Sequence, residues 1–336
     1  MKEAVLLINL GTPDAPTPSK VGKYLTQFLN DKRVIDINAA GRFVLVNLVI
    51  VPFRSFKSSK LYQAIWTKEG SPLLLNSIAL KEKLQAQLGP GHIVELAMRY
   101  QQPSIKNALE RLREQRPSKI HIFPLYPQYA SSSTGSTLEE VLRIIKNWEV
   151  IPDLNIISKF YDHPKFLEAL LAEGRKHNIS DYDHVVFSYH GLPERQIRKA
   201  SAHYGGNTCQ MGACCNSITK NNQYCYRANS FETTRRLVKA LSIPEGKYTT
   251  SFQSRLDDKW LKPFSDKVIE ELGKKGAKKV LVFSPAFVAD CLETIYEIGT
   301  EYDEIFKEHG GDKITLVNSL NANDEWVSAV KEIVLS

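Results

Sequence analysis

Short runs of apolar and β-branched residues recur along the chain, and each run is closed by Gly, Pro or polar residues. Such runs are typical of strands that are buried on both faces of a parallel sheet. The pattern predicts strands at 5–9, 92–96, 119–123, 154–157, 184–189, 248–252, 279–283 and 313–317.

Amphipathic stretches lie between these strands and predict helices at 105–115, 137–146, 164–177 and 231–241. Alternation of strands and helices indicates an α/β fold in which helices cover parallel sheets. The eight strands divide into two groups of four, and 336 residues is about twice the length of a typical domain. We therefore expect two domains, 1–160 and 161–336, with the last helix of the chain packing back on the first domain.

The two halves also resemble each other. The segment 120–127 followed by Leu138-Glu139-Glu140 is similar to 280–287 followed by Leu292-Glu293-Thr294. Each segment predicts a strand, a Pro-containing turn and a helix, which indicates an internal duplication. The alternative is that the segments are alike only because all α/β units share this order of elements.

Two segments depart from this pattern. Residues 43–53 (FVLVNLVIVPF), within a region of about 40–60, are apolar on nearly every side and are followed by basic residues. They suit a core helix, a lip over an apolar pocket, or an interfacial anchor on anionic lipid. The other segment, 199–227, is rich in Cys, Asn, Gly and Tyr and predicts an irregular insertion in the second domain.

Composition and net charge limit the classes of protein and of partner that fit this chain. Hydrophobic residues make up 43% and charged residues 24%, as in ordinary globular proteins. No unbroken run of 18 apolar residues occurs and the N-terminus lacks a signal-peptide pattern, so we expect a cytoplasmic protein without a membrane span. The net charge of +7 suits an anionic small substrate or an anionic membrane surface, and it is too diffuse to indicate nucleic acid.

His190 follows the predicted strand 184–189 and is followed by Gly191 and Pro193. Ligands of open α/β sheets bind beyond the carboxyl ends of the strands, where a His serves as base, acid or metal ligand. A histidine that is simply bonded to a neighbouring loop is the alternative.

A row of carboxylates follows the strand at 279–283. Glu293, Glu297 and Glu301 are spaced four residues apart, which places them on one face of a predicted α-helix, and Asp290 precedes them. Such a row suits passage of hard divalent cations or protons toward a His. A solvated face of a surface helix is the alternative.

These motifs resemble the ferrochelatase family, whose members insert ferrous iron into porphyrin. The resemblance spans essentially the whole chain, and its motifs are INLGTP (8–13), GSPL (70–73), MRY (98–100), PLYPQY (124–129) with STG (133–135), SYHGLP (188–193), FQSR (252–255), WL (260–261) and FVADCLETIYEI (287–298). It implies two similar Rossmann-like domains, each with a four-stranded parallel sheet, and a porphyrin cleft between them.

The resemblance also implies roles for individual residues. His190 and Glu293 match the catalytic pair, and with Glu297, Glu301 and Asp290 they match the metal-handling positions. The residues that match porphyrin-binding positions are Arg99, Tyr100, Tyr129, Ser133, Thr134 and Trp260. The segment 43–53 matches the lip over the porphyrin, which faces the membrane.

The substrates implied are ferrous iron and protoporphyrin IX, which is favoured over coproporphyrin because Asp14 stands where coproporphyrin-using relatives tend to have Tyr. No G-x-G-x-x-G is present, so no nucleotide cofactor is expected. The alternatives are a chelatase for coproporphyrin or for another divalent metal, and a non-catalytic two-lobed tetrapyrrole-binding protein. Peripheral contact with an anionic membrane is expected, and either a monomer or a homodimer fits.

The cysteines form a cluster. Cys209, Cys214, Cys215 and Cys225 fall within seventeen residues, and only Cys291 lies apart. A structural disulfide is unexpected in a reducing compartment, so the spacing C-x4-C-C-x9-C suits a [2Fe–2S] cluster or tetrahedral zinc. The resemblance favours the cluster, because some ferrochelatases carry one, several of them on a C-terminal extension that this chain lacks.

Overall fold

The computed structural model describes residues 2–336 and divides the chain into two compact units. Unit 1 comprises Met1–Tyr126, Ser131–Ser158 and Asn321–Ser336, and unit 2 comprises Pro127–Ala130 and Lys159–Leu320. The C-terminal helix therefore belongs to unit 1. There, Lys83 contacts Asp324 at 2.7 Å and the Trp326 ring packs against that of Phe123.

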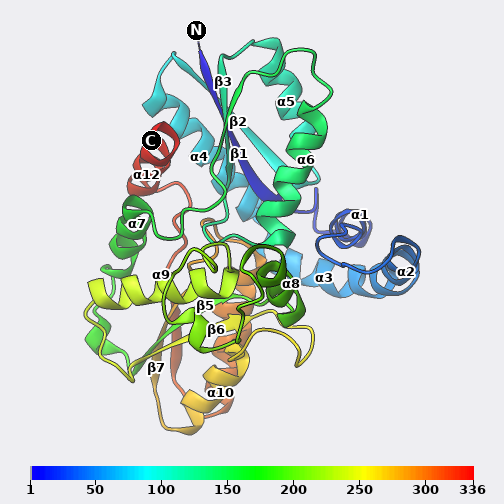
Figure 1. Cartoon of the computed structure of the whole chain (residues 1–336). Helices are drawn as coiled ribbons and strands as arrows, with labels where there is room; N and C mark the ends of the chain where they lie inside the picture. Colours follow the sequence, from blue (N-terminus) through cyan, green and yellow to red (C-terminus); the bar gives the residue numbers. More distant parts are fainter. Residues whose placement is uncertain (1) are drawn as a thin grey trace. The chain divides into compact units, whose positions relative to one another are not determined.

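Each unit contains one four-stranded parallel sheet, and all eight predicted strands are confirmed. In unit 1 the order is β2-β1-β3-β4, with β1 between β2 and β3 (Figure 1), and in unit 2 it is β6-β5-β7-β8. The strands are β1 (Glu3–Gly11), β2 (His92–Tyr100), β3 (Lys119–Pro124), β4 (Asp153–Ile156), β5 (His184–His190), β6 (Tyr248–Gln253), β7 (Lys279–Phe283) and β8 (Lys313–Leu316).

Helical segments connect the strands of each unit. In unit 1 they are α1 (Pro18–Leu29), α2 (Ala39–Val44), η1 (Leu45–Ile50), α3 (Val51–Ile65), α4 (Pro72–Leu88), α5 (Ile105–Glu114), η2 (Ser131–Gly135), α6 (Ser136–Ile145) and α12 (Asp324–Leu335). In unit 2 they are α7 (Pro164–Gly174), η3 (Ile179–Asp181), α8 (Glu194–Tyr204), η4 (Ala213–Cys215), α9 (Tyr226–Ala240), α10 (Ser265–Lys274), η5 (Glu293–Tyr302) and α11 (Asp303–Glu308).

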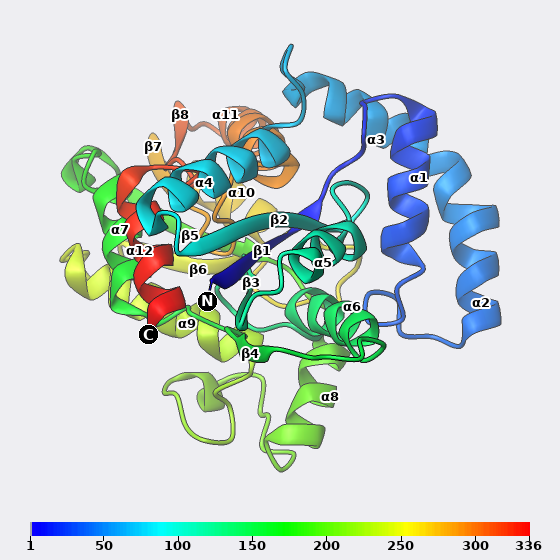
Figure 2. The ribbon, with the colours of Figure 1, turned by 90° about the horizontal axis from the view of Figure 1, so that it is seen from above.

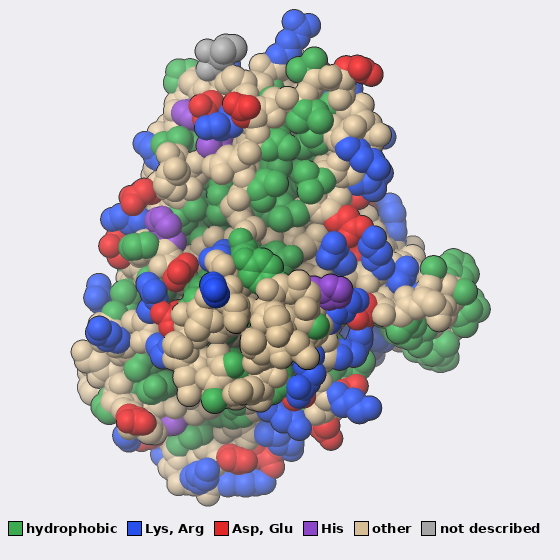
Figure 3. Space-filling view, viewed as in Figure 1, with side chains coloured by type: hydrophobic (Ala, Val, Ile, Leu, Met, Phe, Trp, Pro, Cys, Tyr) green, Lys and Arg blue, Asp and Glu red, His purple; other side chains and the backbone are tan. Residues whose placement is uncertain are grey.

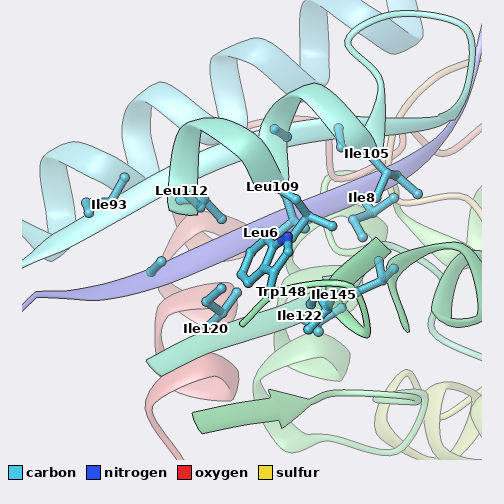
Figure 4. Close-up of a cluster of buried hydrophobic side chains, with 14 residues drawn as sticks. Leu6, Ile8, Ile93, Ile105, Leu109, Leu112, Ile120, Ile122, Ile145 and Trp148 are labelled. Carbon is cyan, nitrogen blue, oxygen red and sulfur yellow. The ribbon is translucent and has the colours of Figure 1, made fainter. Parts of the chain in front are cut away.

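Alternation of side chains along β1 places Leu6 and Ile8 on one face of the sheet, where they meet the apolar stripe of α5 (Figure 4). Leu109 and Leu112 supply that stripe, and Trp148 closes the cluster. These side chains are almost completely buried, and each contributes about 1.5–3 kcal/mol by leaving water. This core fixes the carboxyl ends of the strands, from which the candidate site residues project.

The two units share one sheet topology, in which the first strand lies between the second and the third. Leu6 of β1 pairs with Ile122 of β3, and Val186 of β5 pairs with Val282 of β7, so the central strands of the two sheets are equivalent. An internal duplication would produce this shared topology, and the duplication itself stays a prediction.

The predicted insertion at 199–227 is irregular only in part. Its first residues belong to α8, which ends at Tyr204, and its last two begin α9. The intervening residues contain a single turn of helix, η4, that includes Cys214 and Cys215. The segment 194–204 has the pattern of a surface helix: most of its residues are polar, and Ile197 is the side chain that it buries.

The apolar segment 43–53 lies within one continuous helical run, Ala39–Ile65, that joins α2, η1 and α3. Asn38 caps its start by accepting a hydrogen bond from the amide of Gly41 at 2.8 Å. The run packs along α1 (Figure 2), and Asn47 of η1 shares side-chain hydrogen bonds with Asn30. Of residues 2–336, this run alone is long and apolar enough to cross a membrane by length and composition. The sequence pattern did not show the length of this helix, because polar residues interrupt its apolar run; the expectation that no segment spans a membrane stays a prediction.

The core-helix interpretation of 43–53 is wrong. Val46 is fully buried, but Phe43, Leu48 and Phe53 are 61%, 65% and 77% exposed. Figure 3 shows apolar side chains gathered in the region where α2 lies in Figure 1. We call the exposed apolar residues of this run the apolar ridge: Phe43, Val44, Leu45, Leu48, Val49, Phe53 and Phe56.

Candidate active site

His190 is the last residue of β5, the central strand of the unit 2 sheet. Its Nδ1 lies 2.6 Å from the carbonyl oxygen of Gly191. Because a carbonyl only accepts, Nδ1 carries a proton, and in the neutral ring Nε2 then presents the lone pair. The carbonyl of His190 itself accepts from the Tyr226 hydroxyl at 2.9 Å. The imidazole is therefore held in one tautomer by the turn that follows the strand.

Gly191 is required for that turn. Its amide donates to the carbonyl of Gln253 at 2.7 Å, which brings the two backbones together. A Cβ at this position would lie 2.7 Å from the same oxygen and 3.3 Å from the Trp260 ring. Any larger residue would push His190 out of place. Trp260, a predicted porphyrin-binding residue, thus borders the histidine turn.

The three glutamates of the carboxylate row lie on a π-helix, whereas the sequence predicted an α-helix. The segment η5 starts at Glu293 and ends at Tyr302. A π-helix joins residue i to residue i+5, so residues four apart remain near one another on successive turns. Glu293 and Glu297 are half-buried, and Glu301 is exposed. Long π-helical segments are rare and occur frequently at functional sites.

Glu297 is held by four donors. Its Oε1 accepts from the Ser254 amide at 2.8 Å and from the Tyr302 hydroxyl at 3.0 Å, and its Oε2 accepts from Gln253 Nε2 at 3.0 Å and from Ser254 Oγ at 2.5 Å. These donors fix the orientation of the carboxylate. Burial, and then the charge of Glu297, raises the pKa of the Tyr302 hydroxyl, which therefore stays protonated and donating.

Glu293 has a thiol beside it. Cys291 is buried, and burial raises the pKa of its thiol well above the ordinary value, with a further increase from the charge of Glu293. The neutral thiol donates a hydrogen bond toward that carboxylate. Asp290 accepts from Thr294 Oγ1 at 3.1 Å, which ties it to the first turn of η5.

The structure does not gather the predicted metal-handling residues into a ligand set. Within residues 2–336, no three His, Cys, Asp or Glu side chains are grouped closely enough to hold a metal ion. His190, Asp290 and the three glutamates thus lie along the carboxyl end of one sheet and the helix that follows β7, without converging on a point.

Unit 1 places Arg99 and Tyr100 at the end of β2 in a buried network around Asp31. Asp31 accepts from the Arg99 guanidinium at 2.8 Å, from the Tyr100 hydroxyl at 2.9 Å and from Ser136 Oγ at 2.5 Å. Burial would raise the pKa of Asp31, but the bonds from Ser136 and from the Arg33 amide, with the charge of Arg99, hold that pKa below its ordinary value. Arg99 is therefore a fixed cation, partly neutralised by Asp31.

The other predicted porphyrin-binding residues differ in accessibility. Ser133 is half-buried within η2, whereas Thr134 is fully buried and its hydroxyl has no hydrogen-bond partner among residues 2–336. Tyr129 packs edge-on against Tyr224, with ring centroids 5.4 Å apart. A direct contact between a ligand and the Thr134 side chain would require movement of η2.

The four clustered cysteines interact with one another electrostatically. Hydrogen bonds from the backbone of Gln210 and Gly212, and contacts with Cys215 and Cys209, outweigh burial and lower the pKa of Cys214. Burial raises the pKa of Cys215 to about 11, although the Arg227 guanidinium acts in the opposite direction. Burial also raises the pKa of Cys225, and the charges of Cys209 and Cys214 add to this increase. All four are free thiols, and they do not form a ready metal-binding group.

Sequence reasoning missed Gln253, Tyr302 and Asp31 as parts of these networks. Gln253 was visible only as a member of the FQSR motif, and Asp31 lies in a segment without a marked pattern. The sequence does contain one indication of Gln253, because it is a polar residue at the end of a predicted buried strand. In the structure it pairs in register with His190 on the adjacent strand.

Comparison with known proteins adds to this geometry. Residues 2–336 match the family model described as Ferrochelatase. Ferrochelatase of Legionella pneumophila (strain Lens) is 44% identical over 335 residues, which is 99% of each chain. Ferrochelatase of Coxiella burnetii (strain Dugway 5J108-111) is 42% identical over 340 residues, covering 99% of this chain and 93% of the relative. Among solved structures, SirB from Bacillus subtilis with Fe3+ has a TM-score of 0.54 at 13% identity, covering 99% of this chain and 96% of that one. This last likeness concerns the fold alone.

Proposed function

Since this chain belongs to the ferrochelatase family, we propose that it inserts ferrous iron into a porphyrin, with His190 and Glu293 as the catalytic pair. The observation that carries the residue assignment is the fixed tautomer of His190, which leaves Nε2 free at the carboxyl end of the central strand. A base in that position meets the requirement of the reaction, which releases two pyrrole protons for each metal ion inserted.

His190 suits proton removal because its ring is held and, among residues 2–336, Nε2 has no hydrogen-bond partner. Nδ1 donates to Gly191, so a proton taken up at Nε2 produces an imidazolium whose second N–H is already bonded. The tautomer also suits a neutral imidazole that contacts iron through Nε2. Both roles use the same atom.

Glu293 is the first glutamate of the row and the first residue of η5. Its charge would stabilise an imidazolium or an incoming cation, and the Cys291 thiol supports that charge by donating to it. Asp290 and the exposed Glu301 suit the capture of ferrous iron from solvent, because carboxylate oxygens bind divalent cations. The porphyrin nitrogens themselves supply the final ligands.

Porphyrin binding is assigned to Arg99, Ser133, Tyr129 and Trp260. Tyr100 is 0% exposed, so it is assigned only to hold Asp31 through its hydroxyl, which corrects the expectation that its ring meets the porphyrin. A guanidinium meets the propionates of the ring, and aromatic side chains cover its faces. Binding that favours a bent ring would expose the nitrogen lone pairs and resemble the transition state. Thr134 is assigned only to support η2, because its side chain is buried.

The apolar ridge is proposed to rest on the surface of an anionic membrane. No Asp or Glu occurs between Asp36 and Glu69, and Arg42, Arg54 and Lys57 lie on the same helical run. Exposed apolar side chains flanked by cations are typical of interfacial helices. Lipid contact would bring an apolar porphyrin to the protein without passage through water, at the inner face of the cell membrane.

The four clustered cysteines are proposed to hold a [2Fe–2S] cluster, with zinc as the alternative metal. Four thiols that interact with one another in one irregular segment have the right donor chemistry for either. Residues 195–231 contain no Asp or Glu, so the positive surroundings of the thiols would stabilise an anionic cluster. Ligation would require the side chains to draw together, and no catalytic step is assigned to the cluster.

Metalation assays test the proposed function. Purified protein is incubated anaerobically with ferrous iron and either protoporphyrin IX or coproporphyrin III, and porphyrin fluorescence is followed. We expect the fluorescence of either porphyrin to fall when ferrous iron is present, and we expect a higher kcat/KM for protoporphyrin IX than for coproporphyrin III. A higher value for coproporphyrin would identify the alternative substrate, and faster reaction with cobaltous ion would identify a different chelatase. Porphyrin binding without metalation would leave the non-catalytic alternative.

A further inference from the structure

Gln253 connects the histidine turn to the carboxylate helix. Its carbonyl accepts from the Gly191 amide at 2.7 Å, and its side-chain Nε2 donates to the Glu293 carbonyl at 3.1 Å and to Glu297 Oε2 at 3.0 Å. Ser188 of β5 donates to the remaining oxygen, Oε1, at 2.8 Å. The buried side-chain amide of Gln253 is therefore bonded both to β5, which carries His190, and to η5, which carries Glu293.

The environment of Gln253 makes these bonds rigid. The residue is 1% exposed, and it pairs in register with His190 on the adjacent strand. Ser188 and Ser251 share Ser265 Oγ, each at 2.8 Å, so the amide sits on a buried network of hydroxyls. Both side-chain atoms of Gln253 are satisfied, and rotation of the amide would leave buried polar groups unpaired.

Glu297 is part of the same assembly. All of its described hydrogen bonds come from Gln253, Ser254 and Tyr302, and together they occupy both carboxylate oxygens. A carboxylate that passes iron along a path must exchange its partners for the metal. Glu297 would have to give up four hydrogen bonds to do so, which favours an anchoring role over transport.

We propose that Gln253, acting through Glu297, is a positioning residue that holds the first turn of η5 so that Glu293 faces the reacting centre. This proposal rests on the proposed iron insertion and on the assignment of Glu293. It predicts that weakening the anchor lowers the rate of the chemical step and leaves iron binding nearly unchanged, because Glu293 remains present but is no longer oriented.

The test compares Gln253→Met and Tyr302→Phe with the wild-type protein. Gln253→Met keeps the volume and removes the amide, and Tyr302→Phe removes only the hydroxyl that bonds Glu297. We expect kcat to fall about 30-fold in the first and about 5-fold in the second, with the KM for ferrous iron within about 3-fold of wild type in both. Gln85→Met is the matched control, since Gln85 makes three backbone hydrogen bonds in unit 1, and its kcat should stay within about 2-fold.

A second measurement separates positioning from general stability. In a Glu293→Asp variant the shorter side chain already moves the carboxylate away from the reacting centre. Adding Gln253→Met to this variant should therefore lower kcat by less than about a further 3-fold. Full additivity of the two losses would overturn the proposal, as would a raised KM for iron at unchanged kcat, which would return Glu297 to an iron path. Tyr302→Phe keeps the test open if Gln253→Met fails to fold. Failure of wild-type protein to metalate any porphyrin would instead refute the proposed function.

Discussion

Arg99 and Gln253 make the same main-chain contact in the two units. Arg99 Nε donates to the carbonyl of Ser136, the first residue of α6, at 3.2 Å, and Gln253 Nε2 donates to the carbonyl of Glu293, the first residue of η5, at 3.1 Å. The duplicated fold thus keeps one anchoring hydrogen bond from the second strand of each sheet to the helix after the third.

This equivalence corrects the alignment suggested by the sequence. Pairing Leu138-Glu139-Glu140 with Leu292-Glu293-Thr294 is wrong by three residues, because Ser136 is the counterpart of Glu293. The buried residues agree, since Thr137 and Thr294 are both 0% exposed. The helix α6 of unit 1 therefore begins with Ser136 where η5 of unit 2 begins with Glu293, the proposed catalytic carboxylate.

Replacement of His190 by Ala should reduce turnover to well below one tenth of the wild-type value while porphyrin binding and folding remain nearly intact. The change removes the free Nε2 but leaves the Gly191 turn, whose backbone contacts do not use the side chain. A tenfold loss corresponds to about 1.4 kcal/mol of transition-state stabilisation. Metalation rates and porphyrin titrations measure both properties. His184→Gln, at the opposite end of β5, is the control, and retention of more than a tenth of turnover in His190→Ala would refute the assignment.

Replacement of Glu293 by Gln should lower kcat at least tenfold, because it removes the charge with little change of shape. The KM for porphyrin should change little, since no contact with the ring is assigned to this side chain. Steady-state metalation measures both constants, with Glu304→Gln as a control at an exposed position of α11. Equal activity of the two variants would show that the carboxylate is not needed.

The apolar ridge should govern binding to vesicles. The double change Leu48→Gln and Phe53→Gln removes two exposed apolar side chains and should reduce sedimentation with anionic vesicles severalfold and raise the KM for porphyrin. Val150→Gln with Ile151→Gln, also exposed but outside the helix, is the matched control. Unchanged binding by the ridge variant would mean that the ridge does not contact lipid.

Val46 belongs to a different class from its neighbours on the ridge. It is 0% exposed, so Val46→Asn should destabilise the protein by about 1–3 kcal/mol through burial of an unpaired amide. Urea unfolding measures this loss. A stable Val46→Asn variant with weakened vesicle binding would instead place Val46 at the lipid surface.

Anaerobically purified protein should contain iron and acid-labile sulfide in equal amounts if the four cysteines hold a [2Fe–2S] cluster. The chromophore should disappear in Cys225→Ser and persist in Cys291→Ser, because Cys291 is buried beside Glu293 and lies outside the cluster segment. Metal analysis and visible absorption measure the outcome. A colourless protein that contains zinc and no sulfide would establish the alternative.

Asp31 should make unit 1 sensitive to acid. Its pKa in the folded protein is lower than its ordinary value of about 3.9, so its ionised form stabilises the fold above that pH, and this contribution is lost as the pH falls through and below it. Asp31→Asn should cost about 2–4 kcal/mol near pH 7, because it leaves Arg99 buried without its partner. Urea unfolding at pH 7 and near pH 3 should show this difference shrinking in acid. Asp312→Asn, which alters an exposed ion pair, is the control and should show no such change.

The sequence by itself determined the strands, their division into two sheets, the family and the position of His190. Those features depend on local patterns, since buried strands need continuous apolar residues and a turn after a strand needs Gly or Pro. Contacts between residues far apart in the chain were decided only by the tertiary structure. The sequence placed the carboxylates on an α-helix, whereas η5 is π-helical and Glu297 is bonded by Gln253, Ser254 and Tyr302. It likewise gave no means of separating buried Val46 from exposed Leu48, because hydrophobicity is the same whether a side chain meets the core or the solvent, and only packing distinguishes them.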